Sequence, residues 1–194
     1  MNTSYKIKTF SFMSLDGYIP KTGDYTAWLP EVSQPIENGY DFQQFRDSVS
    51  CVVITGIYHA ALQASDIWPF GDKMCYILTS RSFNLPPDIK ADLILTPEDN
   101  GGDYINAVDQ LRERTGGDIW LAGDQGIITR FMAQGRIDEI TVNVLPVTLG
   151  VGLPMFGSNK QIQDWTLRNH TIYSNGVIQL QYTAARFCDR LQNS

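Results

Sequence analysis

The sequence predicts a single α/β domain of three layers, in which helices flank a mostly parallel central sheet that ends in an antiparallel hairpin. Short, continuous apolar runs such as CVVIT at 51–55 alternate with helical segments, which is typical of parallel strands buried on both faces. The tail at 165–187 consists of two alternating runs joined by Asn-Gly at 175–176, a strong hairpin signal. No linker or internal repeat divides the chain, so we expect residues 1–194 to form one domain.

The predicted elements follow one another in a regular order along the chain. Strands are predicted where β-branched and aromatic residues cluster between turn residues, at 5–13, 51–55, 74–79, 92–96, 119–122 and 137–145. A helix is predicted from amphipathic spacing at 36–49, and further helices are predicted between the strands at 60–64, 101–114 and 127–133. Residues 20–35 hold three prolines and few apolar anchors, so we expect a long loop there that acts as a lid.

Composition and charge exclude several classes of protein. The 15 Lys and Arg residues against 21 Asp and Glu residues leave a net charge of −6 without a basic run, so nucleic acid is a poor partner. No apolar stretch approaches the roughly 18–20 residues that a membrane helix needs, and we expect a cytoplasmic protein that binds a small molecule. Neither a disulfide framework nor a metal site is expected from the few, scattered residues Cys51, Cys75, Cys188, His59 and His170.

Ligands of parallel α/β sheets bind outside the carboxyl ends of the strands, and one such end carries a glycine-containing turn. The turn joins the strand at 119–122 to the next helix and consists of Gly123, Asp124, Gln125, Gly126 and Ile127. Its backbone N–H groups could hold an anion such as a pyrophosphate, or Asp124 could simply cap the helix. The spacing is compatible with both interpretations.

A second strand end carries Thr79, Ser80 and Arg81. Two hydroxyl groups beside a guanidinium suit a phosphomonoester, because arginine offers two parallel hydrogen-bond donors to it. The same three residues could instead form an ordinary polar loop with a solvated arginine. This strand end is therefore a candidate phosphate site.

Acidic and aromatic residues near the start of the chain form a candidate substrate site. Asp41 lies four residues before Phe45, so both share one face of the predicted helix, where the carboxylate could act as an acid or an anchor, or could cap the helix. Asp16 and Tyr18 could line the same mouth, although Asp-Gly is first of all a turn. Trp28 could form a substrate platform or fill its own loop. Asp41 is thus the candidate catalytic residue and the others are candidate substrate-binding residues.

Several segments together resemble the dihydrofolate reductase superfamily. They are SLDGYI at 14–19, VVITGIYHA at 52–60, ILTS at 77–80, IWLAGDQGII at 119–128 and RIDEITVNVLPVTLGVGLPMF at 136–156. The most specific part is Ile-Asp-Glu at 137–139 followed by the pattern P-x-x-L-G-x-G-x-P-x-F at 146–156. This pattern resembles the branch named for the C-terminal reductase domain of the bacterial bifunctional riboflavin deaminase–reductase.

The resemblance implies an NADPH-dependent reductase that transfers hydride to a pterin- or pyrimidine-type substrate. It could be similar to 5-amino-6-(5-phosphoribosylamino)uracil reductase or to dihydrofolate reductase. The resemblance implies three cofactor segments: a first turn at Thr55, Gly56 and Tyr58, the 2′-phosphate site at 79–81, and the pyrophosphate turn at 123–127. It also aligns Asp41 with the carboxylate that holds the pterin in dihydrofolate reductase.

Two residues depart from the family pattern. Asp124 stands where the family usually has a second glycine, and Ile57 stands where a basic residue often follows the first cofactor-turn glycine. A carboxylate beside a pyrophosphate is repulsive, so both changes favour a competing hypothesis: a non-catalytic small-molecule or nucleotide-binding protein on the same scaffold. We also expect a homodimer, formed through the sheet edge by the apolar strand of the C-terminal hairpin.

Overall fold

The computed structural model describes residues 5–19, 39–64, 68–96, 103–157 and 162–185. Within these residues, eight strands form one sheet, in the order β5-β4-β3-β6-β1-β7-β10-β9. In chain order the strands of this sheet are β1 (Ile7–Ser14), β3 (Cys51–Thr55), β4 (Met74–Thr79), β5 (Ala91–Leu95), β6 (Ile119–Leu121), β7 (Glu139–Leu145), β9 (Trp165–Ile172) and β10 (Ile178–Ala184). All pairings are parallel except those that β10 makes with β7 and β9. The predicted mostly parallel sheet with a terminal hairpin is confirmed.

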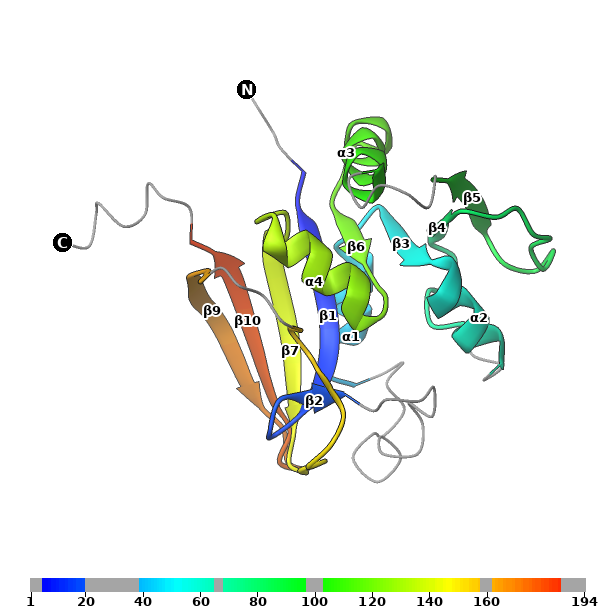
Figure 1. Cartoon of the computed structure of the whole chain (residues 1–194). Coiled ribbons are helices and arrows are strands. Elements are labelled where there is room, and N and C mark those ends of the chain that lie inside the picture. Colours follow the sequence, from blue (N-terminus) through cyan, green and yellow to red (C-terminus); the bar gives the residue numbers. More distant parts are fainter. Residues whose placement is uncertain (1–4, 20–38, 65–67, 97–102, 158–161, 186–194) are drawn as a thin grey trace.

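Helices cover both faces of the sheet. They are α1 (Phe42–Asp47), α2 (Gly56–Ala64), α3 (Asp103–Thr115) and α4 (Gln125–Ala133). Figure 1 shows α4 in front of β1 and α1 behind it. One core contains side chains of α3 and α4, and the other contains side chains of α1 and α2. The three predicted layers are therefore present, and none of the described helices is long and apolar enough to cross a bilayer.

Strand β3 shows why an unbroken apolar run belongs at the centre of this fold. Successive side chains of a strand point to opposite faces of the sheet. Val53 accordingly packs in the core beneath α3 and α4, while Val52 and Ile54 pack in the core beneath α1 and α2. All three are fully buried, so a polar residue at any of them would lie in one of the two cores.

The first helix is shorter than predicted. Its described part begins at Phe42 rather than within a helix at 36–49, and residues 36–38 lie outside the described residues, as does the expected lid at 20–35 with Trp28. Tyr40 and Asp41 have φ values of 59° and 55°, in the left-handed region, so a right-handed helix cannot pass through them. The prediction of a continuous helix through Asp41 was wrong.

A pair of very short strands was missed. Strand β2 (Tyr18–Ile19) pairs antiparallel with β8 (Leu153–Pro154). Two residues are too few to produce a period, so no pattern in the sequence marks either strand. This pairing holds the turn after β1 against the glycine-rich segment after β7, two segments that are far apart in the sequence.

Candidate functional site

A cavity of about 620 Å³ opens at the carboxyl ends of β3, β4 and β6. Most of the predicted cofactor residues line it, namely Thr55, Gly56, Thr79, Ser80, Arg81, Asp124, Gly126 and Ile127. Three predicted cofactor residues, Tyr58, Gly123 and Gln125, are not among the lining residues. Three turns that are far apart in the sequence thus meet at one cavity, as expected for ligand sites of parallel sheets.

The first turn follows β3 and brings it close to the end of β4. Thr55 Oγ1 accepts a hydrogen bond from the backbone N–H of Tyr58 at 3.2 Å, which starts α2. A Cβ atom at Gly56 would lie 3.2 Å from Thr79 Oγ1 and 3.3 Å from Thr79 Cβ. Glycine therefore allows the first turn to approach the end of β4 closely, and a side chain at this position would force Thr79 to shift.

The second turn, at 79–81, is closed by its own hydroxyl group. Thr79 Oγ1 accepts from the backbone N–H of Arg81 at 3.2 Å and donates to the carbonyl of Arg81 at 3.0 Å. This compact turn keeps Arg81 on the cavity wall. The polar-loop and phosphate-site interpretations are compatible here, because the turn is locally closed and Arg81 still lines the cavity.

The third turn is capped by Asp124. Its backbone is extended, and its carboxylate oxygen Oδ1 accepts from the N–H groups of Gly126 at 2.7 Å and Ile127 at 3.2 Å. Thr55 Oγ1 donates to the other oxygen, Oδ2, at 3.0 Å. The helix-cap interpretation of Asp124 therefore describes the structure, and the protein's own carboxylate takes the amides that an anion would use.

Ile57 lines the cavity as part of the first predicted cofactor turn, whereas five lining residues were not predicted: Ala60, Leu78, Phe83, Tyr104 and Arg130. Arg130 lies four residues after Gly126 on α4, and this i,i+4 spacing places both on one helix face, a signal that could have found it. Its guanidinium carbon lies 5.2 Å from the ring centre of Tyr104, within the range of a cation–π contact. Tyr104 comes from α3, so only the packing of helices brings it to the cavity.

Phe83 forms an aromatic wall that extends behind the cavity. Its ring stacks on His59 with ring centres 5.2 Å apart and planes at 24°. His59 is only 2% exposed, and burial lowers the pKa of its imidazole. The buried imidazole of His59 therefore supports the ring of Phe83 by stacking on it.

The candidate catalytic residue Asp41 does not line this cavity. It borders a separate groove of about 270 Å³, together with Phe45, Phe10 and Lys8. Although Asp41 stands at the N-cap position of α1, its side chain makes no capping hydrogen bond, so the helix-cap interpretation is wrong for the side chain. Tyr173 Oη donates instead to Asp41 Oδ2 at 3.4 Å. Burial, followed by the charge of Asp41, raises the pKa of Tyr173 to about 12.

The C-terminal hairpin holds the backbone before α1 in its left-handed conformation. Gln179 Nε2 donates to the carbonyl of Tyr40, and Asn175 Nδ2 donates to Tyr40 Oη at 2.6 Å. The rings of Tyr40 and Tyr173 are in edge contact, with centres 4.7 Å apart. Left-handed non-glycine residues cost of order 1–3 kcal/mol each and persist only where surrounding contacts hold them. The hairpin therefore determines where Asp41 points.

Two predicted substrate residues, Asp16 and Tyr18, take part in bracing a loop. The Asp16 carboxylate accepts from Ser14 Oγ at 2.5 Å, from the N–H of Leu149 at 3.1 Å and from the N–H of Gly150 at 2.8 Å. The hydrogen bond from Ser14, then those from the backbone, lower the pKa of Asp16 to about 2. Tyr18 lies in β2, opposite Pro154. Neither residue lines the cavity at β3, β4 and β6.

The most specific sequence motif, at 146–156, packs against the turn that contains Asp16. Gly150 adopts a left-handed conformation (φ 67°) and donates its N–H to Asp16. A Cβ atom at Gly152 would lie 2.5 Å from the carbonyl oxygen of Ile19, so only glycine fits there. Gly152 therefore allows close backbone packing of β8 against β2, whereas Gly150 allows the left-handed turn that donates to Asp16.

Comparison with known proteins connects this geometry to a family. Residues 5–179 match the family described as the RibD C-terminal domain. The uncharacterized protein YwjB of Bacillus subtilis (strain 168) is 34% identical over 174 residues, which cover 89% of this chain and 94% of that protein.

Two solved structures share the fold. A Shewanella sp. PV-4 protein assigned to riboflavin biosynthesis has a TM-score of 0.78 at 21% identity, covering 93% of this chain and 99% of that chain. Dihydrofolate reductase from Enterococcus faecalis, in a complex with NADP(H), has a TM-score of 0.62 at 12% identity, covering 93% of this chain and 97% of that chain. The predicted dihydrofolate reductase-like fold is therefore confirmed.

Proposed function

Because this chain belongs to the RibD C-terminal domain family, we propose that it is an NADPH-dependent reductase that transfers hydride to a C=N bond of a pterin- or pyrimidine-type substrate. The observation that carries the proposal is the cavity at the carboxyl ends of β3, β4 and β6, with Arg81 in its wall. The structural similarity to a reductase in complex with NADP(H) supports this choice of cofactor.

The lining residues fit the adenosine end of NADPH. Arg81 would pair with the 2′-phosphate, which carries close to two negative charges, and Thr79 stands beside it. Phe83 and Tyr104 offer aromatic surface for a base. When bound, the cofactor would supply the hydride, and the chain would position it and exclude water.

The proton that completes the reduction would reach the substrate nitrogen from water or from Asp41. Asp41 borders its own groove beside α1, so a substrate that uses it would extend from the cofactor toward that groove. The Tyr173 hydroxyl group has a pKa of about 12, so it would remain protonated and keep donating to Asp41 Oδ2 across the neutral pH range.

Binding and turnover can be tested separately. The purified chain would be titrated with NADPH and with NADH, and NADPH oxidation would then be followed with a panel of oxidised pterins and aminopyrimidines. We expect NADPH to bind more tightly than NADH, and at least one compound of these classes to accelerate NADPH oxidation. A chain that binds neither nucleotide would refute the proposed reductase.

A second function, non-catalytic binding of a small molecule or nucleotide on the same scaffold, is favoured by a specific observation. Asp124 already occupies the amides of α4, and Ile57, which is 79% exposed, stands in the cavity wall where a basic residue would attract phosphate. NADPH binding without oxidation by any compound of the panel would support this alternative over the reductase.

We also propose that the chain forms a homodimer through its exposed sheet edge. The edge strand on the side of the C-terminal hairpin is β9, whose Leu167 and Ile172 are exposed. The sequence predicts that the apolar strand IQLQYTAARF at 178–187 forms this contact, but β10, which begins at Ile178, lies between β7 and β9 and is not an edge. Sedimentation that shows a monomer at micromolar concentration would contradict the dimer.

A further inference from the structure

Three hydrogen-bond donors from two turns converge on the carboxylate of Asp124, which lines the cavity. Its Oδ1 atom accepts from the amides of Gly126 and Ile127 in the first turn of α4, at 2.7 Å and 3.2 Å, and its Oδ2 atom accepts from the Thr55 hydroxyl group at 3.0 Å. A helix N-terminus carries a partial positive charge that favours anions. Here a side chain of the protein itself satisfies that charge, although the site faces a cavity large enough for a nucleotide.

We propose that Asp124 sets the cofactor affinity of this protein, because its carboxylate competes with the cofactor's diphosphate for the N-terminus of α4. The proposal rests on the proposed function, in which an anionic dinucleotide enters this cavity. Binding then requires either that the carboxylate leave the two amides or that the diphosphate lie beside a negative charge. Each alternative weakens binding relative to a chain with an uncharged residue at position 124.

The competition is confined to one end of the cavity. Arg81 and Thr79 line the wall contributed by β4, whereas Asp124 stands at the wall contributed by β6 and α4. A ligand that carries a 2′-phosphate but no diphosphate would use the first wall without meeting Asp124. The effect of Asp124 should therefore depend on whether the ligand contains a diphosphate.

Two substitutions separate the charge of Asp124 from its role as a helix cap. Asp124→Ser removes the charge and keeps an oxygen that can accept from the α4 amides. Asp124→Asn removes the charge and keeps the shape of the side chain. The matched control is Asp47→Asn, which removes one negative charge from the exposed end of α1, outside the cavity.

The experiment measures the Kd of NADPH and of adenosine 2′-monophosphate for the wild type and the three variants, by calorimetry, with thermal unfolding to confirm that each variant is folded. We expect NADPH to bind at least tenfold more tightly to Asp124→Ser and Asp124→Asn than to the wild type. Adenosine 2′-monophosphate should bind all four proteins within about twofold, and Asp47→Asn should match the wild type for both ligands.

Each other outcome has a distinct meaning. Unchanged or weaker NADPH binding in both Asp124 variants would overturn the inference while leaving the proposed reductase intact. An equal gain for adenosine 2′-monophosphate, or the same gain in Asp47→Asn, would show a general charge effect and would also overturn it. If no variant binds NADPH, the proposed cofactor fails together with the inference. Tighter NADPH binding without any turnover would support the inference and refute the reductase.

Discussion

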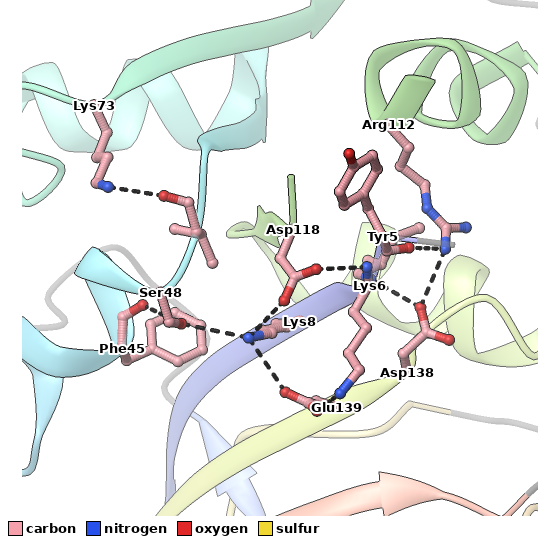
Figure 2. Close-up of polar contacts among 12 residues, drawn as sticks. Tyr5, Lys6, Lys8, Phe45, Ser48, Lys73, Arg112, Asp118, Asp138 and Glu139 are labelled. Atoms are coloured by element: carbon pink, nitrogen blue, oxygen red, sulfur yellow. Dashed lines mark hydrogen bonds and ion pairs between the residues drawn. The ribbon is translucent and has the colours of Figure 1, made fainter. Parts of the chain in front are cut away.

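The two ends of the central sheet are both rich in charged residues, but they use their charges differently. At the amino ends of β1, β6 and β7, cations and anions pair with one another across strands (Figure 2). Lys8 Nζ lies 2.7 Å from Asp118 Oδ2 and 3.5 Å from Glu139 Oε2, with only 12% of its side chain exposed. These contacts fasten neighbouring strands to one another.

At the carboxyl ends of β3, β4 and β6 the charged residues border a cavity. Arg81 and Arg130 line it, and the anion there, Asp124, accepts hydrogen bonds from two backbone amides and a hydroxyl group. The comparison teaches that a cluster of charges does not by itself indicate a binding site. Lys8 and Glu139 also line a groove, so the distinguishing feature is that the anion at the carboxyl ends of the strands binds backbone and hydroxyl donors rather than the cations of a neighbouring strand.

The largest expected effect concerns Arg81, in the cavity at the carboxyl ends of the strands. Arg81→Ala should weaken NADPH binding tenfold to hundredfold, about 1.5–3 kcal/mol, because a charge-assisted pair with the 2′-phosphate is lost. NADH binding and thermal stability should remain nearly unchanged. Titration of both nucleotides against both proteins checks this, and a preference for NADPH that survives the loss of Arg81 would show that the 79–81 turn does not recognise the 2′-phosphate.

A substitution at the amino ends of the strands should instead lower stability and leave NADPH affinity unchanged. Lys8→Met should lower the free energy of unfolding by about 1–2 kcal/mol, because it leaves the partly buried Asp118 and Glu139 short of a cation, while NADPH affinity stays the same. Lys6→Met is the matched control: its side chain is 48% exposed, and its pair with Glu139 should contribute less than about 1 kcal/mol. Urea unfolding measures both, and equal losses would contradict the importance given to burial.

Asp16 lies just after the carboxyl end of β1, where its carboxylate braces a loop and does not line the cavity of β3, β4 and β6. Its folded pKa of about 2 lies below the ordinary value of 3.8, so its bracing is present above about pH 4 and is lost as the pH falls toward 2. Over that range the amide hydrogens of Leu149 and Gly150 should lose protection from exchange. In Asp16→Asn their protection should be lower at neutral pH and should no longer change over that range; wild-type protection that persists at pH 2 would contradict this role.

The smallest expected effect on stability concerns Asp41. Asp41→Asn should change the free energy of unfolding by no more than about 0.5 kcal/mol, because its carboxylate caps no helix and makes one long contact with Tyr173. If Asp41 supplies the proton, turnover should fall while the Kd of NADPH stays the same. Steady-state kinetics beside nucleotide titration distinguish these effects, and unchanged kinetics would remove Asp41 from the mechanism.

Much of the fold could be predicted because local patterns encode it. The apolar run of β3, the other buried parallel strands and the Asn-Gly turn of the hairpin are each visible within a few residues of sequence. The strands β2 and β8 could not be predicted, because each is two residues long and a local pattern needs more residues than that. The start of α1 failed for another reason: contacts from Gln179 and Asn175 hold Tyr40 in the left-handed region, and no local pattern records them.

The sequence by itself determined the α/β architecture and the turns that end β3, β4 and β6, because periodicity and turn residues act over short distances. Only the tertiary structure decided how those turns are used. Asp124 and Gly126 are compatible with a cap or an anion site, and the choice depends also on Thr55, which is 69 positions away along the chain. Tyr104 and Asp41 likewise acquire their neighbours from helices and a hairpin packed on the sheet, and such long-range contacts leave no local pattern in a single sequence.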